Sequence, residues 1–207
     1  MNKIKNILFD LGGVLYDIDY NLTKKAFENL GIDNFDNHFS QKTQNNLFDR
    51  LETGKISNQD FIKSMQELLP SCSRNDIITA WNSILIAMPE ENIHLLENLS
   101  NQYCLYLLSN TNSIHIEYID KELNSRFGLK SLKPLFNKVY LSHEIGRRKP
   151  DQSTFSWLLD DANIKANETL FIDDSIQHID SAKSIGFQTR HWKTNKPISE
   201  LFLGITL

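Results

Sequence analysis

The fold is decided by the stretch IKNILFDLGGVL, residues 4–15, near the start of the chain. Its first half, Ile4–Phe9, is mostly apolar and short, which is typical of a parallel strand that is buried on both faces of a sheet. Asp10 ends this run, and the adjacent glycines Gly12 and Gly13 indicate a tight, irregular turn close to another group. An aspartate at the carboxyl end of such a strand lies where open α/β sheets bind their ligands.

A second apolar run, Leu170–Ile172, ends in two adjacent aspartates, Asp173 and Asp174. If this strand lies beside the first, three carboxylates from opposite ends of the chain meet in one crevice with Asp10. Two like charges after a buried strand repel and raise the pKa of one carboxyl unless a cation neutralises them. Mg²⁺ takes carboxylates, waters and phosphate oxygens, and it fits this set better than Ca²⁺ does. We therefore expect a magnesium site here.

The segment from Asn21 to Ala87 shows only helical periodicity. Its first helix is expected to begin with Asn21 as N-cap and to end before Gly31, since these residue types suit the two ends of a helix. The sequence therefore predicts a helical insertion after the first strand.

After Pro89, helices and strands alternate, which is typical of α/β folds. The predicted strands are residues 104–108, 138–141, 169–172 and 187–192, and the predicted helices are residues 93–99, 114–127, 153–162 and 176–185. Residues 197–207 are expected to form a short closing helix or a tail. The pattern predicts a doubly wound parallel sheet, with a core domain of residues 1–16 and 88–207 and a helical cap domain of residues 17–87.

Size and charge exclude several classes of protein. A chain of 207 residues with 40% hydrophobic content can bury one core and carry a small accessory module. Its formal net charge of -4 provides no basic face for nucleic acid or for a membrane surface. The first apolar run is broken at Asp10, too early for a signal peptide, and no other run approaches the roughly 18 apolar residues of a membrane span. We expect a cytoplasmic protein without nucleic-acid or membrane partners.

The two cysteines, Cys72 and Cys104, lie far apart and have no neighbouring histidine that would suggest zinc. Cys104 begins an apolar strand, where a free cysteine is expected to behave as a small hydrophobe, and Cys72 follows Pro70 and is expected to be a loop or cap residue. We expect neither a disulfide nor a catalytic thiol.

Three further observations concern the chemistry at the ends of strands. Asp10 is the candidate nucleophile, because a carboxylate at an exposed strand end can attack phosphorus or carbon. Ser109 ends the strand at residues 104–108, where its hydroxyl and the following backbone N–H groups can hold a phosphoryl oxygen. Lys149 can neutralise a phosphate and the nucleophile together. Arg147 and Arg148 are interpreted as solvated surface charges and are left out of the site.

These segments occur in the order of the four motifs of the haloacid dehalogenase (HAD) superfamily, which the sequence resembles. The matching segments are FDLGGVL at 9–15, LSNT at 108–111, RKPD at 148–151, and FIDDS at 171–175 with IDSA at 179–182. The resemblance covers essentially the whole chain. It implies a HAD-like Rossmannoid core, and the helical insertion lies where this superfamily places a small cap of its first type.

The resemblance implies a phosphatase that acts on a small phosphorylated metabolite. In this scheme Asp10 attacks a phosphate ester and forms an aspartyl-phosphate, which water then hydrolyses. Ser109 and the Asn110 backbone would orient the phosphoryl oxygens, and Lys149 would neutralise charge.

The same resemblance implies that Mg²⁺ is held by Asp10, by the backbone carbonyl of Gly12 and by Asp174. Asp173 would be a direct or a water-mediated partner of the ion. The sequence does not distinguish which of the two adjacent aspartates binds directly.

Gly12 departs from the family pattern, since related phosphatases usually carry there a second aspartate that acts as general acid and base. Loss of a general acid typically lowers the rate about 10²- to 10⁴-fold. The continuation LYDIDY at 15–20 resembles bacterial sugar-phosphate phosphatases such as α-glucose-1-phosphate phosphatase, which also have glycine at this position. The candidate replacement acids are Asp17, Asp19, His143 and His178.

Two alternatives remain open. Dehalogenases of the superfamily also lack the second aspartate, and in that reading Asp10 would attack carbon without a metal. The retained pair Asp173 and Asp174 argues against it, because a reaction without a metal does not need these two acids as metal ligands. A protein that binds a phosphorylated ligand or a protein partner without turnover is the second alternative, and retention of Asp10, Ser109 and Lys149 together argues against it.

The cap is expected to select the organic group of the substrate. Phe48 and Arg50 are candidate substrate contacts. The aromatic residues Tyr20, Phe27, Phe48 and Trp81 are expected first of all in the core of the cap, because of their helical spacing.

Overall fold

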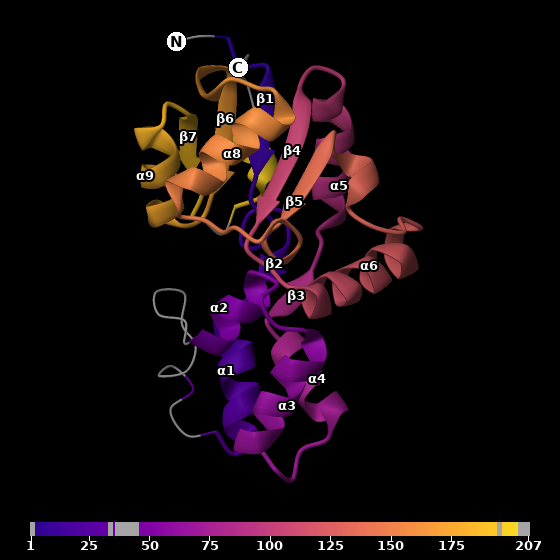
Figure 1. The fold of residues 1–207 in the computed structure, drawn as a ribbon. Helices are drawn as coiled ribbons and strands as arrows, with labels where there is room; N and C mark the ends of the chain where they lie inside the picture. Colours follow the sequence, from indigo (N-terminus) through magenta and orange to yellow (C-terminus); the bar gives the residue numbers. More distant parts are fainter. Residues whose placement is uncertain (1–2, 33–34, 36–45, 194–195, 203–207) are drawn as a thin grey trace.

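The computed structural model describes residues 3–32, 35, 46–193 and 196–202. Its centre is a five-stranded sheet in the order β5-β4-β1-β6-β7, in which all neighbouring strands are parallel (Figure 1). The strands are β1 (Asn6–Phe9), β4 (Cys104–Ser109), β5 (Lys138–Leu141), β6 (Thr169–Asp173) and β7 (Gln188–His191). The predicted parallel sheet is confirmed, and the first and fourth motifs follow adjacent strands.

Helices cover both faces of this sheet. They are α5 (Glu90–Ser100), α6 (Ser113–Phe127), α7 (Ser142–Ile145), α8 (Gln152–Ala162) and α9 (Ile176–Ser184), with short 3-10 segments η2 (Lys133–Leu135), η3 (Ala166–Glu168) and η4 (Ile198–Phe202). Because successive strand residues point to opposite faces, Ile7 and Phe9 of β1 pack in one core with α5 and α6. Leu8 packs in another with α8 and α9. The doubly wound architecture is therefore confirmed.

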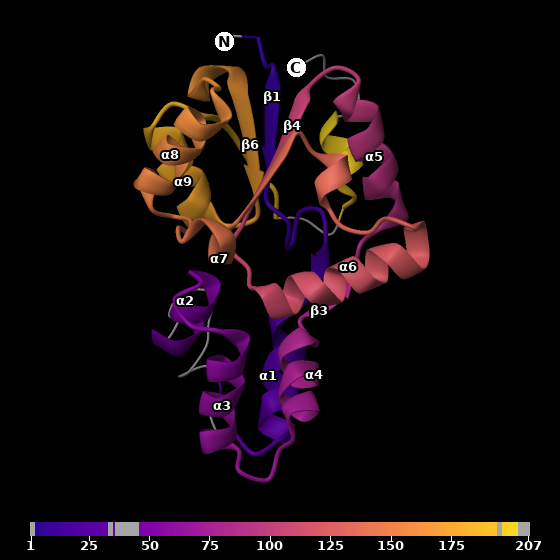
Figure 2. The ribbon, with the colours of Figure 1, turned by 45° about the vertical axis from the view of Figure 1, so that its right-hand side comes forward.

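Four more helices form a separate bundle at one end of the sheet domain (Figure 2). They are α1 (Tyr20–Asn29), α2 (Asn46–Glu52), α3 (Asn58–Leu68) and α4 (Arg74–Asn82). The bundle has its own hydrophobic cluster, in which Phe27, Phe48, Phe61 and Trp81 are almost fully buried. The ring centroids of Phe48 and Trp81 lie 5.1 Å apart. The aromatic side chains at helical spacing thus build the cap core, although Tyr20 lies outside it.

Two local predictions for the insertion are wrong. Residues Leu85–Ala87 are not helical but form strand β3, which pairs antiparallel with β2 (Asp17–Ile18) where the chain passes between the two parts of the fold. Strands of two and three residues are too short to display an alternating pattern. The N-cap of α1 is Asp19, whose side chain accepts from the Asn21 backbone N–H at 2.8 Å.

Cys104 is exposed at the first position of β4, so it does not pack in the core as a small hydrophobe would. Cys72 lies in the turn between α3 and α4, as expected, and both thiols are free. The closing segment is the 3-10 helix η4, and residues 203–207 lie outside the described residues. Within the described part of the chain, no helix combines the length and apolar character needed to cross a membrane.

Candidate active site

Asp10 follows the central strand and starts a tight loop. Its backbone N–H donates to the Ile172 carbonyl at 2.9 Å, and its Oδ1 accepts from the Leu11 N–H at 2.7 Å. Gly13 has a positive φ of 73°, and a Cβ at this position would lie 2.6 Å from Asp174 Oδ2. The second glycine of the motif therefore allows the loop to touch the other acidic strand end, as the paired glycines predicted.

Lys149 is fully buried between two carboxylates. Its Nζ lies 2.8 Å from Asp10 Oδ1 and 2.6 Å from Asp173 Oδ2. Burial alone would lower the pKa of Lys149, but the two carboxylates outweigh it and raise the pKa above its usual value. The lysine therefore stays charged beside Asp10.

The Asn110 side chain positions the backbone of Lys149. Its Nδ2 donates to the Lys149 carbonyl at 2.8 Å, and its Oδ1 accepts from the Lys149 N–H at 2.9 Å. Asn110 follows Ser109, which is buried at the end of β4. The second and third motifs are thus joined by a reciprocal pair of hydrogen bonds, which fixes the position of the Lys149 backbone.

The adjacent aspartates have different surroundings. Asp173 is fully buried, and its carboxylate contacts Lys149, accepts from the Ser175 N–H at 2.8 Å and lies 2.9 Å from His178 Nδ1. Burial would raise the pKa of Asp173, but the charges of Lys149 and His178 and their hydrogen bonds lower it. Asp174 instead lines the pocket, and burial together with the charge of Asp173 raises its pKa.

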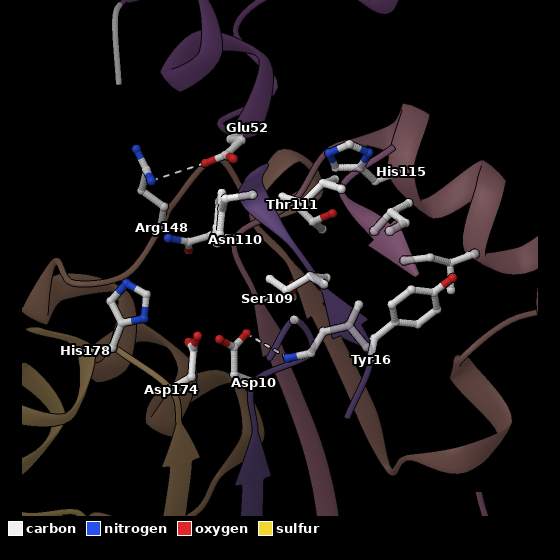
Figure 3. A pocket seen from close by; sticks show the side chains of 17 residues that line it. Asp10, Tyr16, Glu52, Ser109, Asn110, Thr111, His115, Arg148, Asp174 and His178 are labelled. Atoms are coloured by element: carbon white, nitrogen blue, oxygen red, sulfur yellow. Dashed lines mark hydrogen bonds and ion pairs between the residues drawn. The ribbon is translucent and has the colours of Figure 1, made fainter. Parts of the chain in front are cut away.

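A pocket of about 110 Å³ lies over these groups (Figure 3). Of the predicted site residues, Asp10, Gly12, Ser109, Asn110 and Asp174 line it. The other two, Lys149 and Asp173, lie behind this lining and contact Asp10 or one another. The structure therefore brings all seven together, in two layers.

Asp10 is poorly neutralised by protein groups. Its pKa is raised well above the usual value, chiefly by burial and then by the charge of Asp173, against the opposing effect of Lys149. Oxygen atoms of Asp10 and Asp173 and a ring nitrogen of His178 lie within 4.8 Å of one another. Asp10 and Asp174 both line the pocket, and their carboxylate oxygens are the ligands that a hard divalent cation prefers.

Arg148 is a functional candidate that the sequence interpretation missed, because it is not a solvated charge. It lines the pocket, and its Nη1 lies 2.8 Å from Asp49 Oδ1 while its Nη2 lies 3.2 Å from Glu52 Oε2. Both acids belong to α2, so Arg148 connects the core to the cap. The sequence of three basic residues at 147–149 does not indicate which side chain contacts the helical insertion, which lies about 100 residues earlier in the chain.

The structure does not place the two predicted cap contacts, Phe48 and Arg50, at the pocket. Phe48 is buried among the aromatic rings of the cap, Arg50 is exposed, and neither is among the pocket residues. Glu52, one helical turn beyond Phe48, lines the pocket instead. A polar residue at the end of a short helix carries no periodic signal, which is why it was overlooked.

His115 is a second missed residue. Its ring stacks on Trp81 with centroids 4.9 Å apart, and its Nδ1 lies 2.9 Å from Asn82 Oδ1. Burial, and to a lesser degree the charge of His143, lower the pKa of His115 to about 3, so the imidazole stays neutral where it lines the pocket.

The family model for haloacid dehalogenase-like hydrolases matches residues 4–186. The chain belongs to this family. It is similar to the D-ribitol-5-phosphate phosphatase of Bacteroides thetaiotaomicron, with 34% identity over 190 residues that cover 90% of each chain.

Solved structures of the family agree with this fold. A HAD family enzyme of B. thetaiotaomicron, in complex with magnesium and inorganic phosphate, is 34% identical, with a TM-score of 0.87 over 96% of this chain and 99% of that chain. A HAD-like family hydrolase of Porphyromonas gingivalis is 27% identical, with a TM-score of 0.87 over 99% and 100%. An L-2-haloacid dehalogenase at 18% identity and a TM-score of 0.60 shows the shared fold alone.

Proposed function

We propose that this HAD hydrolase is a Mg²⁺-dependent phosphatase of small phosphate monoesters, with sugar and polyol phosphates as the favoured class. The observation that carries the proposal is the ion pair of 2.8 Å between the buried Lys149 and Asp10 at a pocket lined by Ser109 and Asp174. The similarity to D-ribitol-5-phosphate phosphatase supports the substrate class.

Asp10 is the proposed nucleophile. Lys149 Nζ and the Leu11 N–H both contact its Oδ1, so we propose Oδ2 as the attacking atom. A bond forms from this oxygen to phosphorus while the bond from phosphorus to the ester oxygen breaks, and the leaving oxygen takes up a proton from His178 or from solvent and departs as the alcohol. Water then attacks phosphorus, which releases inorganic phosphate and restores the Asp10 carboxylate. Ser109 and the backbone N–H of Asn110 are proposed to hold the phosphoryl oxygens.

The groups proposed to hold Mg²⁺ are Asp10, the Gly12 carbonyl and Asp174. The pKa values of Asp10 and Asp174 are raised by burial and by the charge of Asp173, and a bound cation would offset both effects. Asp173 already binds Lys149 and the Ser175 N–H, so its proposed role is to orient the lysine. Bound Mg²⁺ supplies positive charge to the phosphoryl oxygens.

The missing acid at Gly12 leaves four candidates, and they differ in position. Asp19 is occupied as the N-cap of α1. His178 lines the pocket, whereas Asp17 and His143 are not among the pocket residues. Of the four, His178 is the one that lines the pocket, so we propose it as the replacement acid and base; its Nδ1 contacts Asp173, and burial lowers its pKa.

The domain boundaries are also part of the proposal. The separate hydrophobic cluster of the helical bundle supports a cap of residues 17–87 on a core of residues 1–16 and 88–207, although residues 33–34 and 36–45 lie outside the described part. The pocket between cap and core is where such a cap would select the substrate.

We expect the protein to release inorganic phosphate from sugar and polyol phosphates with Mg²⁺ present, and to lose this activity in excess chelator. A panel of phosphate esters, run with and without Mg²⁺, measures both. Full activity in chelator would contradict the metal assignment. Release of halide from 2-haloacids without metal would favour the dehalogenase alternative, and ligand binding without turnover across the panel would favour a binding protein.

A further inference from the structure

Glu52 is a carboxylate on the cap side of a pocket that is proposed to receive an anion. It ends α2 and is only 7% exposed, and it lines the same pocket as Asp10 and Asp174. Figure 3 shows Glu52 and Arg148 across the pocket from these two aspartates. Another acid in this space makes binding of a phosphate anion less favourable, because like charges repel at short range. Its position therefore suggests a role other than binding phosphate.

Arg148 limits this repulsion and fixes the carboxylate. Its Nη2 lies 3.2 Å from Glu52 Oε2, and its Nη1 lies 2.8 Å from Asp49 Oδ1. Asp49 lies one turn earlier on α2 and is not among the pocket residues. The two acids thus share one arginine, but they differ in access to the pocket. Asp49 takes part only in the ion pairs with Arg148 that connect cap and core, the Arg148 bridge. Glu52 takes part in this bridge and also lines the pocket.

We propose that Glu52 is a specificity-determining residue that accepts hydrogen bonds from hydroxyl groups in the organic part of the phosphate ester. This inference rests on the proposed phosphatase function. A carboxylate held by arginine is an acceptor and cannot donate, so it matches hydroxyl donors and offers nothing to an alkyl chain. Thr111 and the neutral His115 line the same pocket, which adds polar groups for a substrate with several hydroxyls.

The consequence is selection against substrates that lack hydroxyls. An alkyl chain would shield the Glu52 carboxylate from water without offering it a hydroxyl donor, so a site built around hydroxyl groups discriminates against the deoxygenated analogue. The phosphate group binds at the opposite side of the pocket in either case. Glu52 should therefore affect the choice between substrates more than the reaction of the phosphoryl group.

The test compares ribitol 5-phosphate with pentyl phosphate, which has the same chain length and no hydroxyls. In the Glu52→Gln protein we expect kcat/KM for ribitol 5-phosphate to fall about tenfold or more, since a hydrogen bond to a charged group becomes one to a neutral amide. The kcat/KM for pentyl phosphate should not fall. Asp49→Asn is the matched control, because it removes the other half of the Arg148 bridge and should leave the ratio of the two kcat/KM values unchanged.

Three results would overturn the inference while the phosphatase function stands. The first is an equal loss on both esters in Glu52→Gln, which would show that Glu52 acts only through the bridge. The second is a loss of selectivity in Asp49→Asn as large as in Glu52→Gln. The third is a wild-type protein that hydrolyses both esters with equal kcat/KM. A wild-type protein that hydrolyses neither ester would overturn the proposed function and this inference together.

Discussion

Asp10→Asn is expected to lower kcat for phosphate esters by roughly 10³-fold or more. Asp10 is the proposed nucleophile, and without it the residues that act together with it contribute little to the rate. The amide cannot form the covalent intermediate, and Lys149 loses the carboxylate that lies 2.8 Å from its Nζ. The measurement is release of inorganic phosphate from an ester that the wild-type protein hydrolyses, at saturating substrate and Mg²⁺.

The matched control for this variant is Asp17→Asn. Asp17 is an exposed acid in the segment that follows the first motif, and it is not among the pocket residues. We expect Asp17→Asn to retain near wild-type kcat, and thermal unfolding of both variants verifies that they are folded. Retention of more than about a tenth of wild-type kcat in Asp10→Asn would contradict the assignment of the nucleophile.

Lys149→Met should abolish activity and also destabilise the protein. Methionine has a similar length, but it leaves Asp10 and Asp173 buried without the cation that lies within 2.8 Å of both. Removing one partner of a buried ion pair typically costs about 3–5 kcal/mol of the free energy of unfolding. Denaturation by urea measures this loss, because the midpoint and slope give the free energy of unfolding.

The loss of stability in Lys149→Met should depend on pH. Burial already raises the pKa of Asp10 with the lysine present, and loss of the lysine removes the opposing effect. Between the pKa of Asp10 in the unfolded chain and its raised folded-state pKa, the folded variant binds more protons, so its free energy of unfolding should rise as pH falls through the folded-state pKa. Lys138→Met is the control, because Lys138 pairs with Asp161 at an exposed position. Unchanged stability of Lys149→Met would contradict the role of the buried lysine.

The positions of Asp10, Ser109 and Lys149 could be predicted from sequence for a physical reason. The first two follow apolar runs that become the parallel strands β1 and β4, and parallel strands bring their carboxyl ends to one edge of the sheet. Lys149 follows the short elements β5 and α7, and its motif placed it at the same edge. Local patterns were sufficient wherever the strand itself fixes the position of the residue after it.

The division of roles between Asp173 and Asp174 was not available from sequence. Adjacent residues at a strand end point in different directions, and which one faces the pocket depends on the neighbouring strands. In the structure, Asp173 points back to Lys149 and Asp174 lines the pocket.

The contacts between cap and core were also beyond sequence reasoning. Arg148 contacts Asp49 and Glu52 because the helical bundle packs over the sheet edge. No sequence pattern around any of the three residues indicates that packing. Strands β2 and β3 were missed because elements of two and three residues cannot display a period.

The most direct test of the central claim is to look for the phosphoryl group on Asp10. The wild-type protein is mixed with substrate and Mg²⁺, quenched in acid at short times, digested and measured by mass spectrometry. We predict that the peptide with Asp10 gains the mass of one phosphoryl group, and that the same peptide from Asp10→Asn does not. Hydrolysis without this modification at any quench time, or with the phosphoryl group on another residue, would contradict the account.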